Sequence, residues 1–83
     1  MNWTPVESSQ IKEIGYDHES SILGIRFHPS KKAREAGATH SEYHYANVGP
    51  EMHASLMAAE SKGRFFDANI KAFPKDFPFT KVG

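Results

Sequence analysis

The chain has 83 residues, no cysteine, and ten acidic residues against ten basic ones. A chain this short forms one domain with a small core, residues 1–83, which a homodimer would stabilise further. The missing cysteines exclude disulfides, thiolate zinc sites and a thiol nucleophile. The balanced charge argues against strong non-specific binding to duplexes, which needs many phosphate contacts, but it leaves room for a local anion site.

No part of the sequence predicts a membrane partner. No apolar run approaches the roughly 20 residues of a membrane span, and the first residues lack the basic and apolar regions of a signal peptide. Together with the cysteine-free composition, this predicts a cytoplasmic protein.

Three segments in the first half of the chain have the residue pattern of β-strands. They are residues 10–17, 22–27 and 40–48. In the first segment Ile14 and Tyr16 alternate but Ile11 is out of phase, which predicts an irregular start. The second alternates cleanly, with Leu23 and Phe27 on the same face. Short or moderate connections between three such segments favour an antiparallel meander.

A polar insert, Pro29 to His40, separates the second and third predicted strands. Its central part, Lys31 to Ala38, has the composition of a short helical turn ended by Gly37. We predict a surface protrusion that carries Lys31, Lys32 and Arg34. It is either a tolerated loop insertion or a surface for a partner of this particular protein.

The period of the pattern changes to that of a helix after Val48. Pro50 suits the first position of a helix because its missing N–H is not needed there. Apolar residues then recur at helical spacing, and Gly63 is placed to cap the end of this first helix.

A second short helix is indicated by Phe66, Ile70 and Phe73, with Pro74 ending it. The two phenylalanines beyond it, Phe77 and Phe79, predict an extended tail that folds back on the domain. The sequence therefore predicts an α+β fold: a small three-stranded antiparallel β-meander followed by two short helices packed on one face.

The order of these features resembles the KTSC domain. The motifs that carry the resemblance are Ser8-Ser9, Ile14-Gly15-Tyr16-Asp17, Leu23-Gly24-Ile25-Arg26-Phe27, Tyr43-His44-Tyr45, Val48-Gly49-Pro50 and Ser61-Lys62-Gly63-Arg64-Phe65-Phe66 with Ile70. This module is named for its occurrence at the C-terminus of some lysyl-tRNA synthetases and is also found as small stand-alone bacterial proteins. The family is generally of unknown function, and the resemblance implies RNA binding only through the company of a synthetase. The insert departs from the tight turn that the family has there.

The two tyrosines of the central motif share a face of their strand because side chains two residues apart point the same way. If that face is open, Tyr43 and Tyr45 can stack on bases while Lys62 and Arg64 hold phosphates. The alternative is that at least one of the two packs into the core, where buried aromatic area stabilises small domains.

The segment around Gly63 is the second candidate site. A glycine there permits a left-handed backbone, and the N–H groups that open the next helix attract anions, helped by Lys62 and Arg64. The alternative is an ordinary helix cap with basic side chains near a helix end. The segment lacks the glycine spacing of a P-loop.

No residue set predicts a metal, a cofactor or catalysis. His40, Glu42 and His44 alternate on the face opposite the tyrosines, but a polar, solvent-facing strand explains them. No serine lies in a nucleophile elbow. We predict a non-catalytic binding module for RNA or a nucleotide-like anion. The alternatives are an adaptor or inhibitor that uses the insert and the aromatic tail to bind a cellular protein, and a dimer that sequesters a small ligand.

Overall fold

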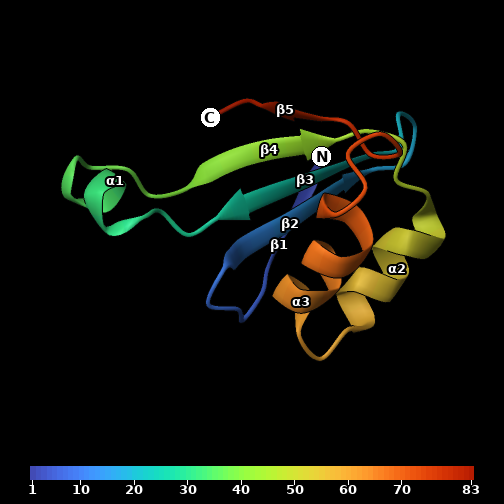
Figure 1. Cartoon of the computed structure of the whole chain (residues 1–83), viewed down its shortest axis with the longest axis horizontal. Coiled ribbons are helices and arrows are strands. Elements are labelled where there is room, and N and C mark those ends of the chain that lie inside the picture. The colour runs from blue at the N-terminus through green and yellow to red at the C-terminus, as the bar shows by residue number, and fades with distance from the viewer.

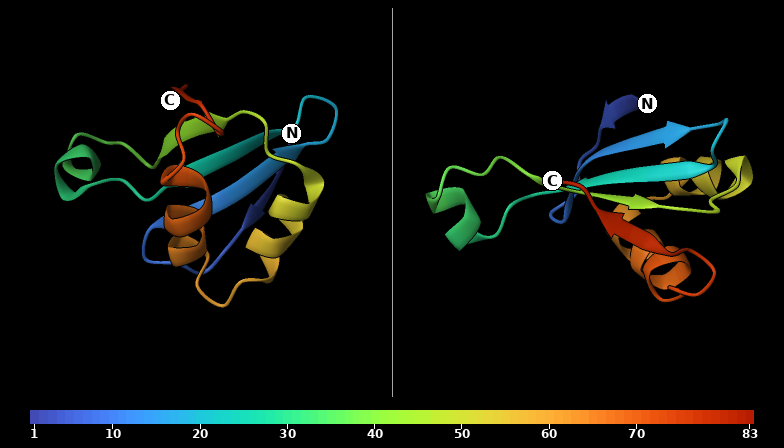
Figure 2. Two further views of the ribbon diagram at one scale, coloured as in Figure 1. Left: turned by 45° about the vertical axis from the view of Figure 1, so that its right-hand side comes forward. Right: turned by 90° about the horizontal axis from the view of Figure 1, so that it is seen from above.

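The structure is a computed structural model that describes all of residues 1–83. Five antiparallel strands form one sheet in the order β1-β2-β3-β4-β5, and the helices after β4 cover one of its faces (Figures 1 and 2). The strands are β1 (Asn2–Pro5), β2 (Ile11–Asp17), β3 (Ile22–Phe27), β4 (Ser41–Tyr45) and β5 (Phe79–Lys81). The helices are α1 (Lys31–Glu35), α2 (Pro50–Ala58), α3 (Lys62–Phe66) and the π-helical turn η1 (Asp67–Lys71).

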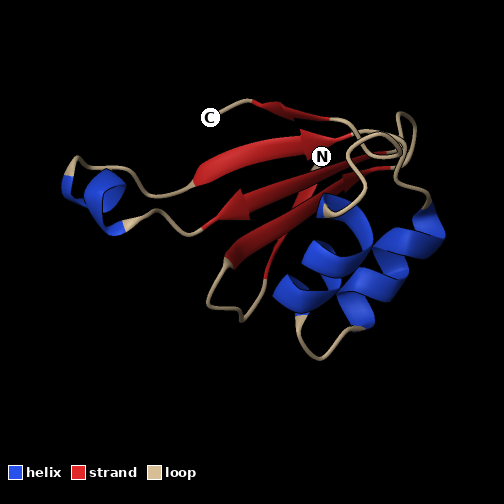
Figure 3. Cartoon of the chain, viewed as in Figure 1, coloured by secondary structure: helices blue, strands red, loops and turns tan.

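The α+β class, the central meander and the helices on one face are as predicted (Figure 3), but the prediction of three strands is wrong. β1 adds a strand beside β2, where Trp3 lies opposite Gly15. The extended tail adds another, β5, which pairs with β4 and puts Phe79 opposite Tyr45. Both are short edge strands, whose formation depends on their neighbours more than on their own residues.

The irregular start predicted for β2 is a β-bulge. The pairing with β3 shifts its register between Ile11 and Glu13. A bulge places one extra residue in a strand and so changes which side chains point inward. Ile11 and Ile14 are therefore both buried although they are three residues apart.

The core lies between the sheet and the helices. Phe66 of α3 lies at its centre, fully buried, with its ring 5.0 Å from that of Tyr45 and 5.6 Å from that of Phe27, both in edge contacts. Edge-to-face aromatic packing of this kind stabilises small cores. The buried apolar side chains are Ile11, Ile14, Tyr16, Leu23, Ile25, Tyr45, Val48, Leu56, Phe66 and Ile70.

Pro50 begins α2 as predicted, but Gly63 does not cap its end. The helix ends at Ala58, and Gly63 lies buried inside the next helix, α3. Ser61 caps α3 by accepting a hydrogen bond from the backbone N–H of Arg64. Phe73 also differs from the prediction, because the helical run ends at Lys71 and leaves this side chain 49% exposed.

The insert between β3 and β4 forms the predicted protrusion, which extends beyond the end of the sheet and carries α1 (Figure 1). Ser30 caps α1 by accepting a hydrogen bond from Ala33 N–H. Gly37 follows the helix with a φ of +96°, a conformation that favours glycine.

Candidate binding site

The tyrosines of the central motif point toward the helices, and they differ in exposure. Tyr45 is only 4% exposed and belongs to the core through its contact with Phe66. Tyr43 lies two residues earlier in β4 and is half-buried. Its ring centroid lies 5.6 Å from that of Phe27 and 5.9 Å from that of Phe79. One tyrosine therefore serves the fold, and the other presents its ring at the surface.

The two rings line a surface hollow of about 370 Å³ between β3, β4, β5 and η1. We call it the aromatic hollow. Its lining consists of Gln10, Phe27, Ser41, Tyr43, Tyr45, Lys71 and Phe79. Four aromatic rings supply its apolar surface, and Lys71 is its single charged side chain. The arrangement suits a flat, apolar group that carries a negative charge.

The hydroxyls of Tyr43 and Tyr45 make no hydrogen bond within the chain, in contrast to Tyr16, whose hydroxyl donates to Val48 O at 2.6 Å. No buried polar side-chain atom lacks a partner, so the Tyr45 hydroxyl reaches solvent at the hollow although its ring is buried. Burial, helped by Tyr43 and Asp67, raises the pKa of Tyr45 to about 12. Near neutral pH the hydroxyl is thus a neutral donor available to a ligand.

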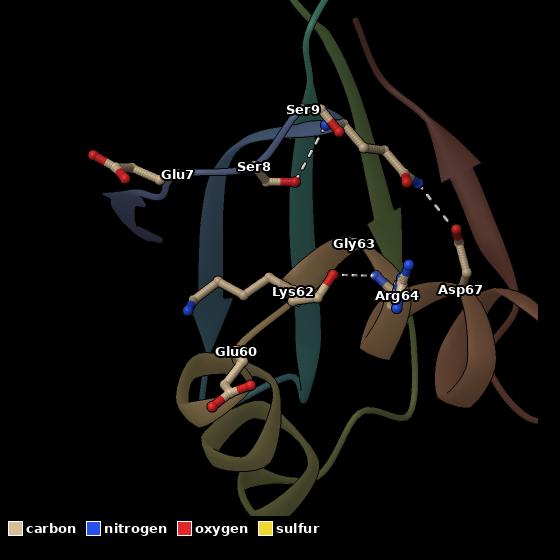
Figure 4. A pocket seen from close by; sticks show the side chains of 10 residues that line it. Glu7, Ser8, Ser9, Glu60, Lys62, Gly63, Arg64 and Asp67 are labelled. Atoms are coloured by element: carbon tan, nitrogen blue, oxygen red, sulfur yellow. Dashed lines mark hydrogen bonds between the residues drawn. The ribbon is translucent and has the colours of Figure 1, made fainter.

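Lys62, Gly63 and Arg64 lie in a different hollow, of about 240 Å³, between the β1–β2 loop and the α2–α3 connection (Figure 4). No apolar side chain lines it, and its two basic side chains face three acidic ones, Glu7, Glu60 and Asp67. Lys62 also donates to Ala59 O at 3.1 Å. The structure therefore does not bring the phosphate candidates beside the tyrosines, and the negative balance of this hollow disfavours an anion.

Gly63 has a structural role that the sequence does not reveal. A β-carbon at this position would lie 3.1 Å from Gln10 Oε1 and 3.4 Å from Ser8 Oγ. Ser8 in turn accepts hydrogen bonds from the backbone N–H groups of Gln10 and Ile11. The glycine therefore allows the helix to approach the β1–β2 loop closely, which joins the Ser8-Ser9 motif to the Ser61–Phe66 motif.

Gln10 separates the two hollows, since it lines both and its Nε2 donates to Asp67 Oδ1 at 3.0 Å. Phe27, Phe79 and Lys71 also line the aromatic hollow, and none of the three was predicted as a site residue. Phe27 could have been found from its shared face with Leu23 in β3. Lys71 could not, because its position depends on the π-helical turn, a feature that often occurs at functional sites.

The face of the sheet without helices carries a charged network. Arg26 donates to Glu42 Oε1 at 2.9 Å and to Glu13 Oε1 at 3.2 Å, and His44 Nε2 lies 2.8 Å from Glu42 Oε2. Burial alone would raise the pKa of Glu42, but its hydrogen bonds with Arg26 and His44 hold that pKa below its ordinary value. The predicted opposition of Glu42 and His44 to the tyrosines is correct, and no group of three potential ligands suited to a metal ion is present.

Comparisons with known proteins agree with this architecture. The family model of the KTSC domain matches residues 7–73, a range that contains β2, β3, β4 and the helices and leaves β1 and β5 outside. The chain belongs to the KTSC domain family.

Individual relatives extend over most of the chain. A protein of Tsukamurella paurometabola is 45% identical over 67 residues, covering 81% of this chain and 85% of the relative. An uncharacterized protein of Stutzerimonas stutzeri is 30% identical over 82 residues, covering 99% of each. The crystal structure of a KTSC domain protein from Yersinia pestis superposes with a TM-score of 0.78 at 36% identity, over 99% of this chain and 97% of that one. None of the helices is long and apolar enough to cross a membrane.

Proposed function

We propose that this protein is a non-catalytic binding module whose aromatic hollow holds a nucleotide, either free or within single-stranded RNA. The observation that carries the proposal is the composition of the hollow: four aromatic side chains and one lysine, with two tyrosine hydroxyls that have no partner in the chain. A base stacks on Tyr43 and Phe79, and Lys71 pairs with a phosphate.

The size and energetics of the hollow fit such a ligand. A volume of about 370 Å³ lies at the low end of the roughly 300–1,000 Å³ of small-molecule sites, which suits a single nucleotide unit. Base–aromatic stacking contributes about 1–3 kcal/mol per base. One stacked base and one phosphate contact give weak binding, so further nucleotides of an RNA strand would add affinity through contacts outside the hollow.

Titration of a labelled single-stranded RNA hexamer at two salt concentrations tests the proposal. Tyr43→Ala should weaken binding by about 5- to 150-fold, because 1–3 kcal/mol of stacking is lost. Lys71→Gln should weaken binding and should reduce by about one the slope of the logarithm of the affinity against the logarithm of the salt concentration. The matched controls are Phe73→Ala and Lys75→Gln, an exposed aromatic and an exposed lysine outside the hollow. Equal losses in the controls, or no binding by the wild type at low salt, would contradict the proposal.

A protein-interaction role is the second candidate function. Exposed apolar side chains concentrate in the C-terminal part of the chain, where Phe73, Phe79 and Val82 are 49%, 55% and 48% exposed. Phe79 belongs to β5, an edge strand, and edge strands present unpaired backbone groups to other chains. Native mass spectrometry tests the simplest form of this role: a homodimer that Val82→Lys dissociates supports it, and a monomer at all concentrations contradicts it.

A further inference from the structure

A third hollow, of about 530 Å³, lies at the base of the insert. It is close to the first residues of β2 and β4 and to the last residue of β3. We call it the basic hollow. Its lining consists of Ser9, Lys12, His28, Pro29, Arg34, Ala38 and Thr39. No acidic side chain is among them, which distinguishes it from the hollow around Lys62 and Arg64.

The two permanent cations of this hollow, Lys12 and Arg34, make no ion pair within the chain. The ion pairs of the structure all involve Arg26 or Glu42 on the sheet face without helices. Arg34 therefore keeps all five of its N–H donors available. Lys12 donates one hydrogen bond, to Thr39 O at 3.1 Å, and keeps two donors. This bond also fixes the ammonium group at the base of the insert.

His28 adds a third basic group whose ring is held in place. Its Nε2 lies 3.0 Å from Ser8 O, and a carbonyl can only accept, so Nε2 carries the proton and Nδ1 is left free. The backbone N–H of His28 donates to Gln10 O at 3.0 Å, which fixes the residue from a second side.

We propose that the basic hollow is a binding site for a phosphate-class oxyanion, either inorganic phosphate or the phosphate monoester of a larger ligand. Arg34 and Lys12 supply charge-assisted hydrogen bonds, which are the strong kind for phosphate, and Ser9 and Thr39 line the same space. The insert thereby gains a function, since it carries Arg34 over a hollow that would otherwise lack its guanidinium. This site is independent of the aromatic hollow.

Isothermal titration of the full chain with inorganic phosphate and with pyrophosphate at low ionic strength tests the site. Arg34→Gln and Lys12→Gln should each weaken binding about tenfold or more, as expected for a charge-assisted hydrogen bond, and the double variant should abolish it. The matched controls are Lys31→Gln and Lys32→Gln, which remove the same charge from the same insert at positions that do not line the hollow. Both should bind within about twofold of the wild type once screening is equal.

The same variants identify the source of the anion and separate this site from the aromatic hollow. If a phosphate monoester occupies it, AMP should lose affinity in Arg34→Gln while adenosine does not. If free phosphate is the ligand, only the inorganic anions respond; either result supports the site. Tyr43→Ala should leave phosphate affinity unchanged, so failure of the nucleotide proposal would not affect this test. Absence of phosphate and pyrophosphate binding, or equal losses in Lys31→Gln and Arg34→Gln, would overturn the inference.

Discussion

Replacing Gly24 by alanine should displace the single tryptophan of the chain. Trp3 lies on the sheet face without helices, where a β-carbon on Gly24 would stand 2.6 Å from Trp3 Cη2 and 2.6 Å from Met1 Sδ. Carbon atoms in contact prefer about 3.5–4.0 Å, so the indole must move by about 1 Å. A β-carbon on Gly15 would likewise lie only 2.9 Å from Trp3 Cδ2, so the indole packs closely against both glycines.

The displacement should lower the free energy of unfolding by about 1–3 kcal/mol, the usual effect of overpacking. Part of the lost stability comes from the contact between Arg26 and the indole, since the guanidinium carbon lies 3.9 Å from the ring centroid. Such a cation–π contact contributes about 0.5–1 kcal/mol at an exposed site. The total stability expected for 83 residues is about 4–12 kcal/mol, so the loss is measurable.

Tryptophan fluorescence and urea denaturation monitored by circular dichroism are the assays. Because Trp3 is the only tryptophan, the fluorescence emission reports the surroundings of this residue alone. The emission should shift to longer wavelength in Gly24→Ala. In a Trp3→Ser background Gly24→Ala should lose most of its effect on stability, which a double-mutant cycle measures. Unchanged emission together with the same stability loss in both backgrounds would refute the reasoning.

Three further predictions concern His53, which is half-buried, and the buried Tyr45 and Phe66. Burial, with a smaller effect of His18, lowers the pKa of His53. As the pH falls, the unfolded chain therefore takes up a proton at this residue before the folded chain does, and the free energy of unfolding should decrease below about pH 6.5. An equal urea midpoint at pH 7 and pH 5.5, or a decrease of that midpoint that is unchanged in His53→Gln, would contradict this. The pKa of Tyr45 at about 12 predicts an increase in absorbance at 295 nm near that pH, which should disappear in Tyr45→Phe. The free energy of unfolding should also decrease as the pH rises from about 10 toward 12. A titration of the wild type without this increase would contradict the burial of Tyr45. Phe66→Ala should cost about 3–5 kcal/mol and Phe66→Leu about 1.5 kcal/mol or less, and a loss below 1 kcal/mol for alanine would show that Phe66 is not the centre of the core.

The sequence predicted those parts of the fold whose signal is local. β3 alternates cleanly, and the out-of-phase Ile11 correctly indicated an irregular β2. The edge strands were not predicted as strands because their formation depends on contacts far along the chain. Trp3 of β1 packs over Gly15 and Gly24, which are paired neighbours in β2 and β3. This pairing is a contact between distant residues, so the sequence around Trp3 does not indicate it.

The candidate site was predictable only in part. Alternation correctly gave Tyr43 and Tyr45 a common face, but it could not show that Tyr45 is buried and Tyr43 is not, since that depends on where Phe66 packs. Gly63 satisfies the sequence rule for a helix cap and for a close helix–loop approach equally well, and only the position of the β1–β2 loop decides for the second. Lys71 enters the hollow through a π-helical turn that no periodicity indicates.

The most direct test of the nucleotide proposal is a two-dimensional ¹H–¹⁵N NMR titration of the labelled protein with the unlabelled RNA hexamer. The proposal predicts that the backbone amides of Tyr43, Lys71 and Phe79 shift together and saturate with one affinity. In Tyr43→Ala the shifts of Lys71 and Phe79 should report an affinity weaker by about 5- to 150-fold, without unfolding of the chain. Shifts confined to Arg26, Glu42 and the rest of the sheet face without helices, or no shifts at low salt, would contradict it.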